Sequence, residues 1–133
     1  MFNTLVLRNR EEKAILRDPE LAEKFSCFDP DMVNHRTYVV ALEAGKVVGM
    51  VALLDQTMRM ENAVGVGFVE SHLDHRNRGI ARLLVDGLFQ YARKSRKAIA
   101  NSAYTSDGRK WLQPLIKEAA ERYPDVPLHE REF

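Results

Sequence analysis

The sequence predicts a mixed α/β fold in which helices flank a sheet. Two β-branched, apolar runs, 37–42 and 46–54, are separated by Glu43-Ala44-Gly45, as is typical of an antiparallel hairpin. A further apolar run, 64–69, leads through a glycine-containing turn into a long amphipathic segment, which indicates a strand followed by a helix. Along the whole chain, these patterns predict the element order β-α-α-β-β-β-α-β-α-β.

The N-terminal third predicts a short strand, over 5–7, and two helical segments. Asn9 with Glu12 three residues later is a variant of the capping box, which starts the first helix. Asp18 and Pro19 start the second, because Asp caps well and Pro is tolerated at the first helical position.

Glycines mark the strands that follow a turn-rich loop at 28–31. Gly49 interrupts the second hairpin strand, which usually indicates a β-bulge or a close approach to the backbone. The next strand is expected over 63–72, where Gly65 and Gly67 weaken its regularity.

The helix that begins near Gly79 has the clearest pattern in the sequence. Its apolar residues recur at i, i+3, i+4 and i+7 and are expected to cover a sheet. They are Ile80, Leu83, Leu84, Gly87, Leu88, Tyr91 and Ala92. The polar residues Arg82, Asp86, Gln90, Arg93 and Lys94 fall elsewhere around the helix.

The C-terminal part predicts a strand, a helix and a last strand. Residues 98–102 form the strand, Thr105 or Ser106 caps the helix, and 126–133 form the last strand. Pro114 lies inside this helix and should kink it.

Length and composition fit a single domain spanning 1–133, with 45% hydrophobic and 29% charged residues. The net charge of +1 argues against a dedicated nucleic-acid binder. Cys27 is the only cysteine, so no intrachain disulfide can form, and we expect a small buried hydrophobe in a reducing compartment. No secretory leader or apolar run of membrane-spanning length is found, so we expect a cytoplasmic protein with no membrane partner.

The segment Arg76-Asn77-Arg78-Gly79-Ile80-Ala81-Arg82 lies between a strand and a helix and is typical of a phosphate-binding turn. The first N–H groups of a helix lack internal partners, and with the helix dipole they favour an anion. Small residues at Gly79 and Ala81 would let a pyrophosphate approach the main chain.

This segment resembles motif A of the GCN5-related N-acetyltransferase (GNAT) superfamily, Arg/Gln-x-x-Gly-x-Gly/Ala, through Arg76, Gly79 and Ala81. The resemblance implies a mostly antiparallel, mixed sheet and an acetyl-CoA-dependent transferase without a metal. It also implies that main-chain groups of the helix start bind the pyrophosphate and those of a splayed strand end bind the pantetheine arm. The implied cofactor-binding residues are Val69, Ser71, Arg76, Asn77, Arg78, Gly79, Ile80, Ala81 and Arg82.

Acetyl transfer to an amine needs a base, because an alkylamine with a pKa of ~10.4 is almost wholly protonated at neutral pH. Glu70 is the candidate, since it lies at the strand end where the resemblance places the thioester. A solvated carboxylate on an alternating strand explains Glu70 equally well. Many family members place a catalytic Glu further upstream, where this chain has Gly65, so Glu61 and His72 are alternatives.

The leaving thiolate would gain from a proton donor. The family's usual donor is a Tyr in the last helix, but 113–115 of this chain contains none. Tyr104 is the nearest phenol to the expected acetyl position, although an aromatic residue beside a strand end is more often packing. Ser106 is a weak substitute for the family's Asn at the start of that helix.

Three charged clusters have ordinary explanations. His72, Asp74 and His75 lack further ligands with the spacing of a metal site. The basic cluster after the long helix, Arg93, Lys94, Arg96 and Lys97, suits a helix C-terminus, although it could also touch a nucleic acid. Acids in the first third would suit a cationic amine or a solvated face: Glu11, Glu12, Asp18, Glu20, Glu23, Asp29 and Asp31.

The sequence therefore predicts an N-acetyltransferase that transfers acetyl from acetyl-CoA directly to a primary amine of a small molecule or a protein. The first alternative is a non-catalytic CoA-binding regulator or inhibitor of another protein, because the upstream Glu and the helix Tyr are missing. The second, less favoured, is a nucleic-acid-associated module. A missing closing strand would leave a sheet edge that a second copy could cover in a homodimer.

Overall fold

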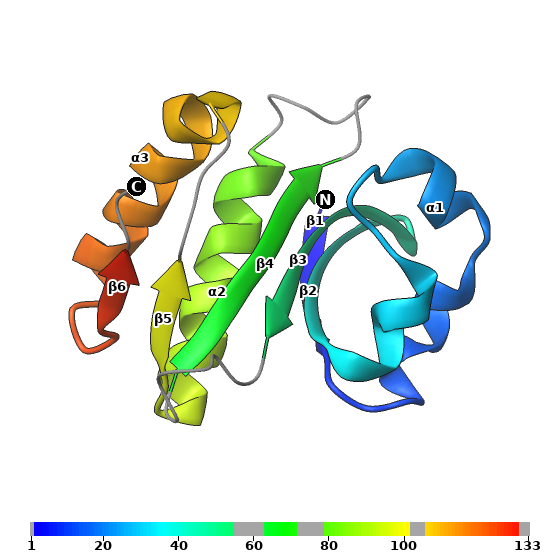
Figure 1. The fold of residues 1–133 in the computed structure, drawn as a ribbon, viewed down its shortest axis with the longest axis horizontal. Helices are drawn as coiled ribbons and strands as arrows, with labels where there is room; N and C mark the ends of the chain where they lie inside the picture. The colour runs from blue at the N-terminus through cyan, green and yellow to red at the C-terminus, as the bar shows by residue number, and fades with distance from the viewer. Residues whose placement is uncertain (1, 55–62, 72–78, 102–105, 131–133) are drawn as a thin grey trace.

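The structure, a computed structural model, describes residues 2–54, 63–71, 79–101 and 106–130. These residues form a six-stranded sheet with helices on both faces (Figure 1). The strands are β1 Phe2–Leu7, β2 Thr37–Glu43, β3 Lys46–Leu54, β4 Ala63–Ser71, β5 Ala98–Asn101 and β6 Leu128–Glu130. The helices are α1 Glu20–Lys24, α2 Ile80–Ser95 and α3 Ser106–Arg122, and two 3-10 turns are η1 Glu12–Arg17 and η2 Pro30–His35. The predicted α/β class is confirmed.

The strands lie in the sheet in their order along the chain, and the sheet is mostly antiparallel as expected. Strands β1 to β4 pair antiparallel, whereas β4–β5 and β5–β6 pair parallel. The β2–β3 hairpin turns through Ala44 and Gly45, whose φ angles of 51° and 79° are both positive. Two positive φ angles are what a type I′ hairpin turn requires.

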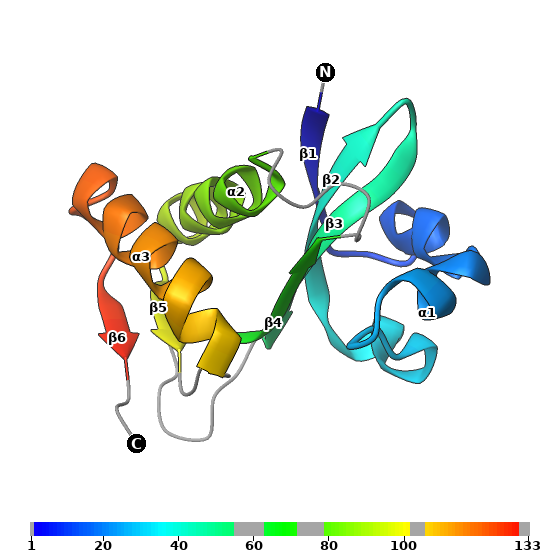
Figure 2. The same cartoon turned by 90° about the horizontal axis from the view of Figure 1, so that it is seen from above.

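Both faces of the central strands are covered, which explains their apolar runs. Helices α2 and α3 lie on one face, and α1 with its flanking 3-10 turns lies on the other (Figure 2). Val39 and Val51 pack into the core beneath α2 and α3, and Tyr38 and Met50 pack into the core beneath α1. Side chains of neighbouring residues therefore enter two different cores.

Gly49 lets α2 approach the backbone of β3, as the sequence predicted. A Cβ atom at this position would lie 2.7 Å from Ile80 Cγ2 and 2.9 Å from Leu84 Cδ1. A register shift between Ala41 and Leu42 of β2 also lies beside it. The sequence predicted either a bulge or a close approach at Gly49, and the structure shows both.

The apolar stripe of α2 is wider than the periodicity predicted. Leu84 and Leu88 are buried as expected, but Val85 and Phe89 are buried as well. The reason is that α3 packs against α2, and the Phe89 ring stacks on the Tyr123 ring with centroids 6.0 Å apart. The helix therefore has one side on the sheet and another on α3.

The predicted capping box forms, but the turn it starts is a 3-10 turn instead of an α-helix. Asn9 Oδ1 accepts from the Glu12 N–H at 2.9 Å, and Glu12 Oε1 accepts from the Asn9 N–H at 3.2 Å. The backbone N–H groups of Arg8 and Asn9 lower the pKa of Glu12. Asp18 caps α1 as predicted, because its Oδ1 accepts from the Glu20 N–H at 3.0 Å.

Candidate functional site

Strand β4 leaves β5 halfway along its length. The two strands pair at three positions, which end at Gly65 and Ala100. Beyond Gly65, β4 continues to Ser71 with only β3 as its partner among the described residues, and Figure 1 shows it running past the end of β5. Its side chains are buried up to Gly65 and partly or fully exposed from Val66 onward. One edge of this strand end therefore presents main-chain N–H and C=O groups that pair with none of the described strands.

A bulge at Gly67 lies at the start of this free edge. The register with β3 shifts, so that Ala52 pairs with Phe68 and Leu53 with Val66. A Cβ atom at Gly67 would lie 3.2 Å from the Ala52 carbonyl oxygen, which is tighter than ordinary contact. Glycine therefore lets the two strands stay close through the bulge.

The N-terminal turn of α2 has the features of an anion site. Gly79 caps the helix with a φ of 77°, a left-handed conformation that favours glycine, and its carbonyl accepts from the Leu83 N–H at 3.1 Å. No side-chain cap and no acidic residue occur in this first turn, as far as the chain is described. The N–H groups of Ile80, Ala81 and Arg82 therefore lack intrahelical acceptors and point towards one end of the helix.

Gly49 brings the strand end and the helix start together. It pairs with Ser71 at the end of β4, and its Cα faces Ile80 at the start of α2. Of the residues implied to bind the cofactor, Val69, Ser71 and the segment 79–82 therefore meet at one end of the sheet. The others, Arg76, Asn77 and Arg78, lie outside the described residues.

The described part of this site fits coenzyme A. A diphosphate suits the amide groups of the α2 turn, which itself contains no acidic residue, and no atom of the described residues lies within 4 Å of a Cβ placed at Gly79. An amide-bearing pantetheine arm could pair with the free edge of β4 in the way that an added strand does.

Glu70 connects β4 to the loop after α1. One carboxylate oxygen, Oε2, accepts from the Ser26 N–H at 2.8 Å, and Oε1 accepts from the Cys27 N–H at 3.0 Å and the Ser26 hydroxyl at 3.2 Å. A carboxylate has about four lone-pair sites, so these contacts leave room for one more donor. This contact could not be predicted from the sequence, because Ser26 and Cys27 lie 44 and 43 residues before Glu70 along the chain.

Cys27 is exposed, so the expectation of a buried thiol is wrong. Its backbone N–H binds Glu70, which holds this short loop at the surface beside the buried rings of Phe25 and Phe28. At this loop the core is therefore filled by the two phenylalanines and not by the cysteine between them.

Several candidate catalytic residues lie outside the described residues: Tyr104, Glu61 and His72. Gly65, which stands where many family members carry a catalytic Glu, lies where β4 leaves β5. A side chain at Gly65 is missing, so no base can come from this position. Among the residues that are described, no three His, Cys, Asp or Glu side chains lie together as a metal site would need.

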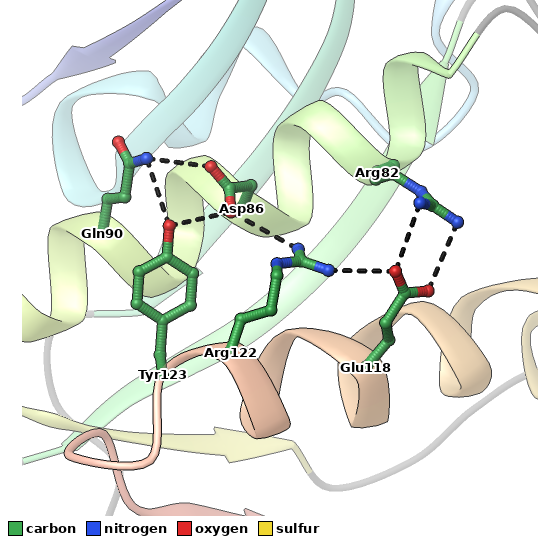
Figure 3. Close-up of polar contacts among 6 residues, drawn as sticks. All are labelled: Arg82, Asp86, Gln90, Glu118, Arg122 and Tyr123. Atoms are coloured by element: carbon green, nitrogen blue, oxygen red, sulfur yellow. Dashed lines mark hydrogen bonds and ion pairs between the residues drawn. The ribbon is translucent and has the colours of Figure 1, made fainter.

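Sequence reasoning missed a polar network between α2 and α3 (Figure 3). Asp86 is its centre: it accepts from the Tyr123 hydroxyl and from Gln90 Nε2, both at 2.8 Å, and from Arg122 at 3.4 Å. Glu118 binds Arg122 at 3.1 Å and Arg82 at 3.2 Å. The signal was the four-residue spacing of Arg82, Asp86 and Gln90, which places them on one helix face.

The described helices include none that is both long enough and apolar enough to span a membrane.

The chain matches the family described as "Acetyltransferase (GNAT) domain" over residues 13–107. No curated protein sequence is detectably similar to it.

Solved structures with the same fold include three acetyltransferases. Ribosomal-protein-alanine N-acetyltransferase from Brucella melitensis biovar Abortus 2308 is 23% identical, with a TM-score of 0.63, over 85% of this chain and 88% of its own. Tetrahymena GCN5 is 15% identical, with a TM-score of 0.64, over 85% and 77% of the two chains. AAC(6')-Iy, solved with the bisubstrate analog CoA-S-monomethyl-acetylneamine, is 13% identical, with a TM-score of 0.65, over 86% and 89%.

Proposed function

The chain belongs to the acetyltransferase (GNAT) family, and from this premise we propose that it transfers the acetyl group of acetyl-CoA directly to a primary amine. The observation that supports this most is the free edge of β4 beyond Gly65, beside the first turn of α2, which lacks a side-chain cap. The free edge offers main-chain donors and acceptors to an extended pantetheine arm, and the neighbouring helix turn offers amide donors to a diphosphate.

Acetyl-CoA supplies an acyl group activated as a thioester. The chain's part is to orient it: the N–H groups of Ile80, Ala81 and Arg82 hold the diphosphate, and the main chain of Val69 and Ser71 holds the arm. An N–H of this strand end that faces the thioester oxygen would also stabilise the negative charge developing there. In this direct transfer both substrates would occupy the site together, so no acyl-enzyme is required.

We propose Glu70 as the general base. Its side chain is on the strand end that holds the arm, is partly exposed and retains room for one more donor besides Ser26 and Cys27. Removing the proton of an alkylammonium at pH 7 costs about 4–5 kcal/mol, at about 1.4 kcal/mol per pKa unit, so a positioned base matters. For the leaving thiolate, Tyr104 is the proposed proton donor.

The acceptor is proposed to be a cationic amine, carried by a small molecule or a protein. Glu20, Glu23 and Asp29 are exposed around the loop that Glu70 holds, and they would attract such a cation. The neighbours acetylate different classes of acceptor according to their names, a ribosomal protein for one and aminoglycosides for others.

The cofactor site is tested by comparing Gly79→Glu with Gly45→Glu. Both glycines have nearly the same positive φ, 77° and 79°, and open space at Cβ, so both variants carry similar strain of about 1–2 kcal/mol. Only Gly79→Glu places a carboxylate at the α2 turn. We expect it to weaken CoA binding at least tenfold by isothermal titration calorimetry, while Gly45→Glu binds like the wild type.

A wild-type protein that binds neither CoA nor acetyl-CoA, or equal binding by both variants, would contradict the proposal. Transfer is tested separately, by following release of the CoA thiol with a panel of primary amines. Binding of acetyl-CoA with slow hydrolysis and no transfer to any amine would favour the non-catalytic alternative, a CoA-binding regulator.

A further inference from the structure

Arg82 is the end member of the polar network in Figure 3. Its guanidinium binds the Glu118 carboxylate with both terminal nitrogens, Nη1 to Oε1 at 3.2 Å and Nη2 to Oε2 at 3.3 Å. It is also the third residue of α2, so it lies in the same turn whose amide groups are proposed to hold the diphosphate. This ion pair therefore connects the α3 helix to the proposed cofactor site.

The Arg82–Glu118 ion pair is weak and can be broken at little cost. The two side chains are 60% and 42% exposed, and ion pairs of this kind are weak and screened by salt. In addition, the positive end of the helix dipole disfavours a cation in the first turn unless an anion accompanies it. Glu118 supplies that anion in this structure.

The remaining network stays paired when Arg82 leaves. Glu118 keeps Arg122, four residues along α3, at 3.1 Å. Arg122 in turn keeps Asp86 at 3.4 Å, and Asp86 keeps the Tyr123 hydroxyl at 2.8 Å. Release of Arg82 therefore leaves no carboxylate of the network without a cation or a donor.

We propose that Glu118 is a competing anion: it holds the Arg82 side chain, which exchanges Glu118 for a phosphate group when coenzyme A binds. The inference rests on the proposed function, because the phosphate is that of the proposed cofactor. A diphosphate carries more charge than a carboxylate and matches the two-pronged guanidinium equally well. Glu118 is thus a positioning residue that acts on cofactor affinity only through Arg82.

The test measures the Kd of CoA by isothermal titration calorimetry for Glu118→Gln, Arg82→Gln and the double variant. Glu118→Gln should tighten binding about two- to fivefold, which is about 0.4–1 kcal/mol at 1.4 kcal/mol per tenfold and within the range of exposed ion pairs. Arg82→Gln should weaken binding several-fold. In the Arg82→Gln background, Glu118→Gln should have no further effect, because its route to the ligand is gone.

Glu121→Gln is the matched control, since it removes the same charge from an exposed site on the same helix, outside the network of Figure 3. The exchange would be overturned by any of three results. Glu118→Gln could bind CoA more weakly than the wild type or equally well, Glu121→Gln could tighten CoA binding as much as Glu118→Gln does, or Glu118→Gln could still tighten binding in the Arg82→Gln background. If the wild type binds CoA, these outcomes leave the proposed function intact. If the wild type does not bind CoA, the proposed function fails and the exchange fails with it.

Discussion

Glu70 joins two parts of the molecule that are far apart in sequence, and this decides how its role can be tested. Its carboxylate is proposed as the base, yet it also accepts hydrogen bonds from Ser26 and Cys27. Loss of the carboxylate would therefore affect both proton transfer and the loop. Loss of the Ser26 hydroxyl would affect the loop alone.

Glu70→Gln should lower kcat at least 100-fold at pH 7, because a general base contributes about 10²–10⁴. Ser26→Ala removes the hydroxyl's 3.2 Å bond to Glu70 and its 3.9 Å contact with the Cys27 sulfur, and should cost a few-fold. The Glu70→Gln deficit should shrink as the pH rises towards the amine's pKa of ~10.4, where about half of the amine is already neutral. Steady-state rates across this pH range check the expectation, and equal losses in the two variants would assign Glu70 to loop positioning instead.

Tyr38 is fully buried beneath α1, and its hydroxyl has no hydrogen-bond partner among the described residues. Because an unpaired buried hydroxyl is costly, Tyr38→Phe should raise the free energy of unfolding by about 1 kcal/mol. Tyr123→Phe is the matched contrast: its hydroxyl donates to Asp86 at 2.8 Å, so the same change should destabilise by about 1–2 kcal/mol. Urea unfolding measures both, and a loss of stability in Tyr38→Phe would show that its hydroxyl is paired.

The same residue predicts a pH dependence. Burial raises the pKa of the Tyr38 phenol above its ordinary value of 10.0, with Arg36 opposing and Asp29 adding to the rise. The unfolded chain therefore loses this proton first as the pH increases. The contribution of the neutral phenol to the free energy of unfolding is therefore retained below pH 10 and decreases above it. The Tyr38→Phe variant should not show this decrease.

Among the elements, the packing of α2 on β3 controls the position of the first turn of α2, which is proposed to bind the cofactor. Ile80 is the first residue of α2 and is also one of the two side chains that cover Gly49. Any atom added at Gly49 would push against the start of the helix. Position and stability of the turn are therefore linked through one glycine.

Gly49→Ala should lower the free energy of unfolding by about 1–3 kcal/mol, the usual cost of overpacking, because its Cβ would lie 2.7 Å from Ile80. Gly67→Ala adds the same methyl group to the neighbouring strand, where the nearest atom is 3.2 Å away, and should cost less. Urea unfolding of the two variants checks the order. A Gly49→Ala protein within 0.5 kcal/mol of the wild type would mean that α2 shifts freely, against the general cost of overpacking.

At the scale of the whole molecule, the candidate site lies where the sheet changes from antiparallel to parallel. The hairpin-connected strands β1 to β4 form one part, and β5 and β6, joined through α3, form the other. Helix α2 contacts strands of both parts and holds them together while β4 and β5 diverge. The edge strand β6 is where a second copy was expected to bind, which stays a prediction.

Most of the elements, and the turn that is proposed to bind the cofactor, could be predicted from the sequence because they depend on local physics. The 3.6-residue period of α2, the capping box at Asn9 and the glycine at Gly79 each act within a few residues of their own position. The hairpin and the close approach at Gly49 follow from equally local signals. These features could be read without knowing what lies across the sheet.

What faces each of these elements depends on long-range packing and is seen only in the folded chain. Glu70 contacts Ser26 and Cys27 only because folding brings them together. The exposure of Cys27 and the second buried side of α2 also depend on packing between distant segments. So does the pairing of Arg82 with Glu118, 36 residues away. A single sequence carries no periodic signal for such pairs, because the free energy that selects them comes from packing across the fold and not from the local chain.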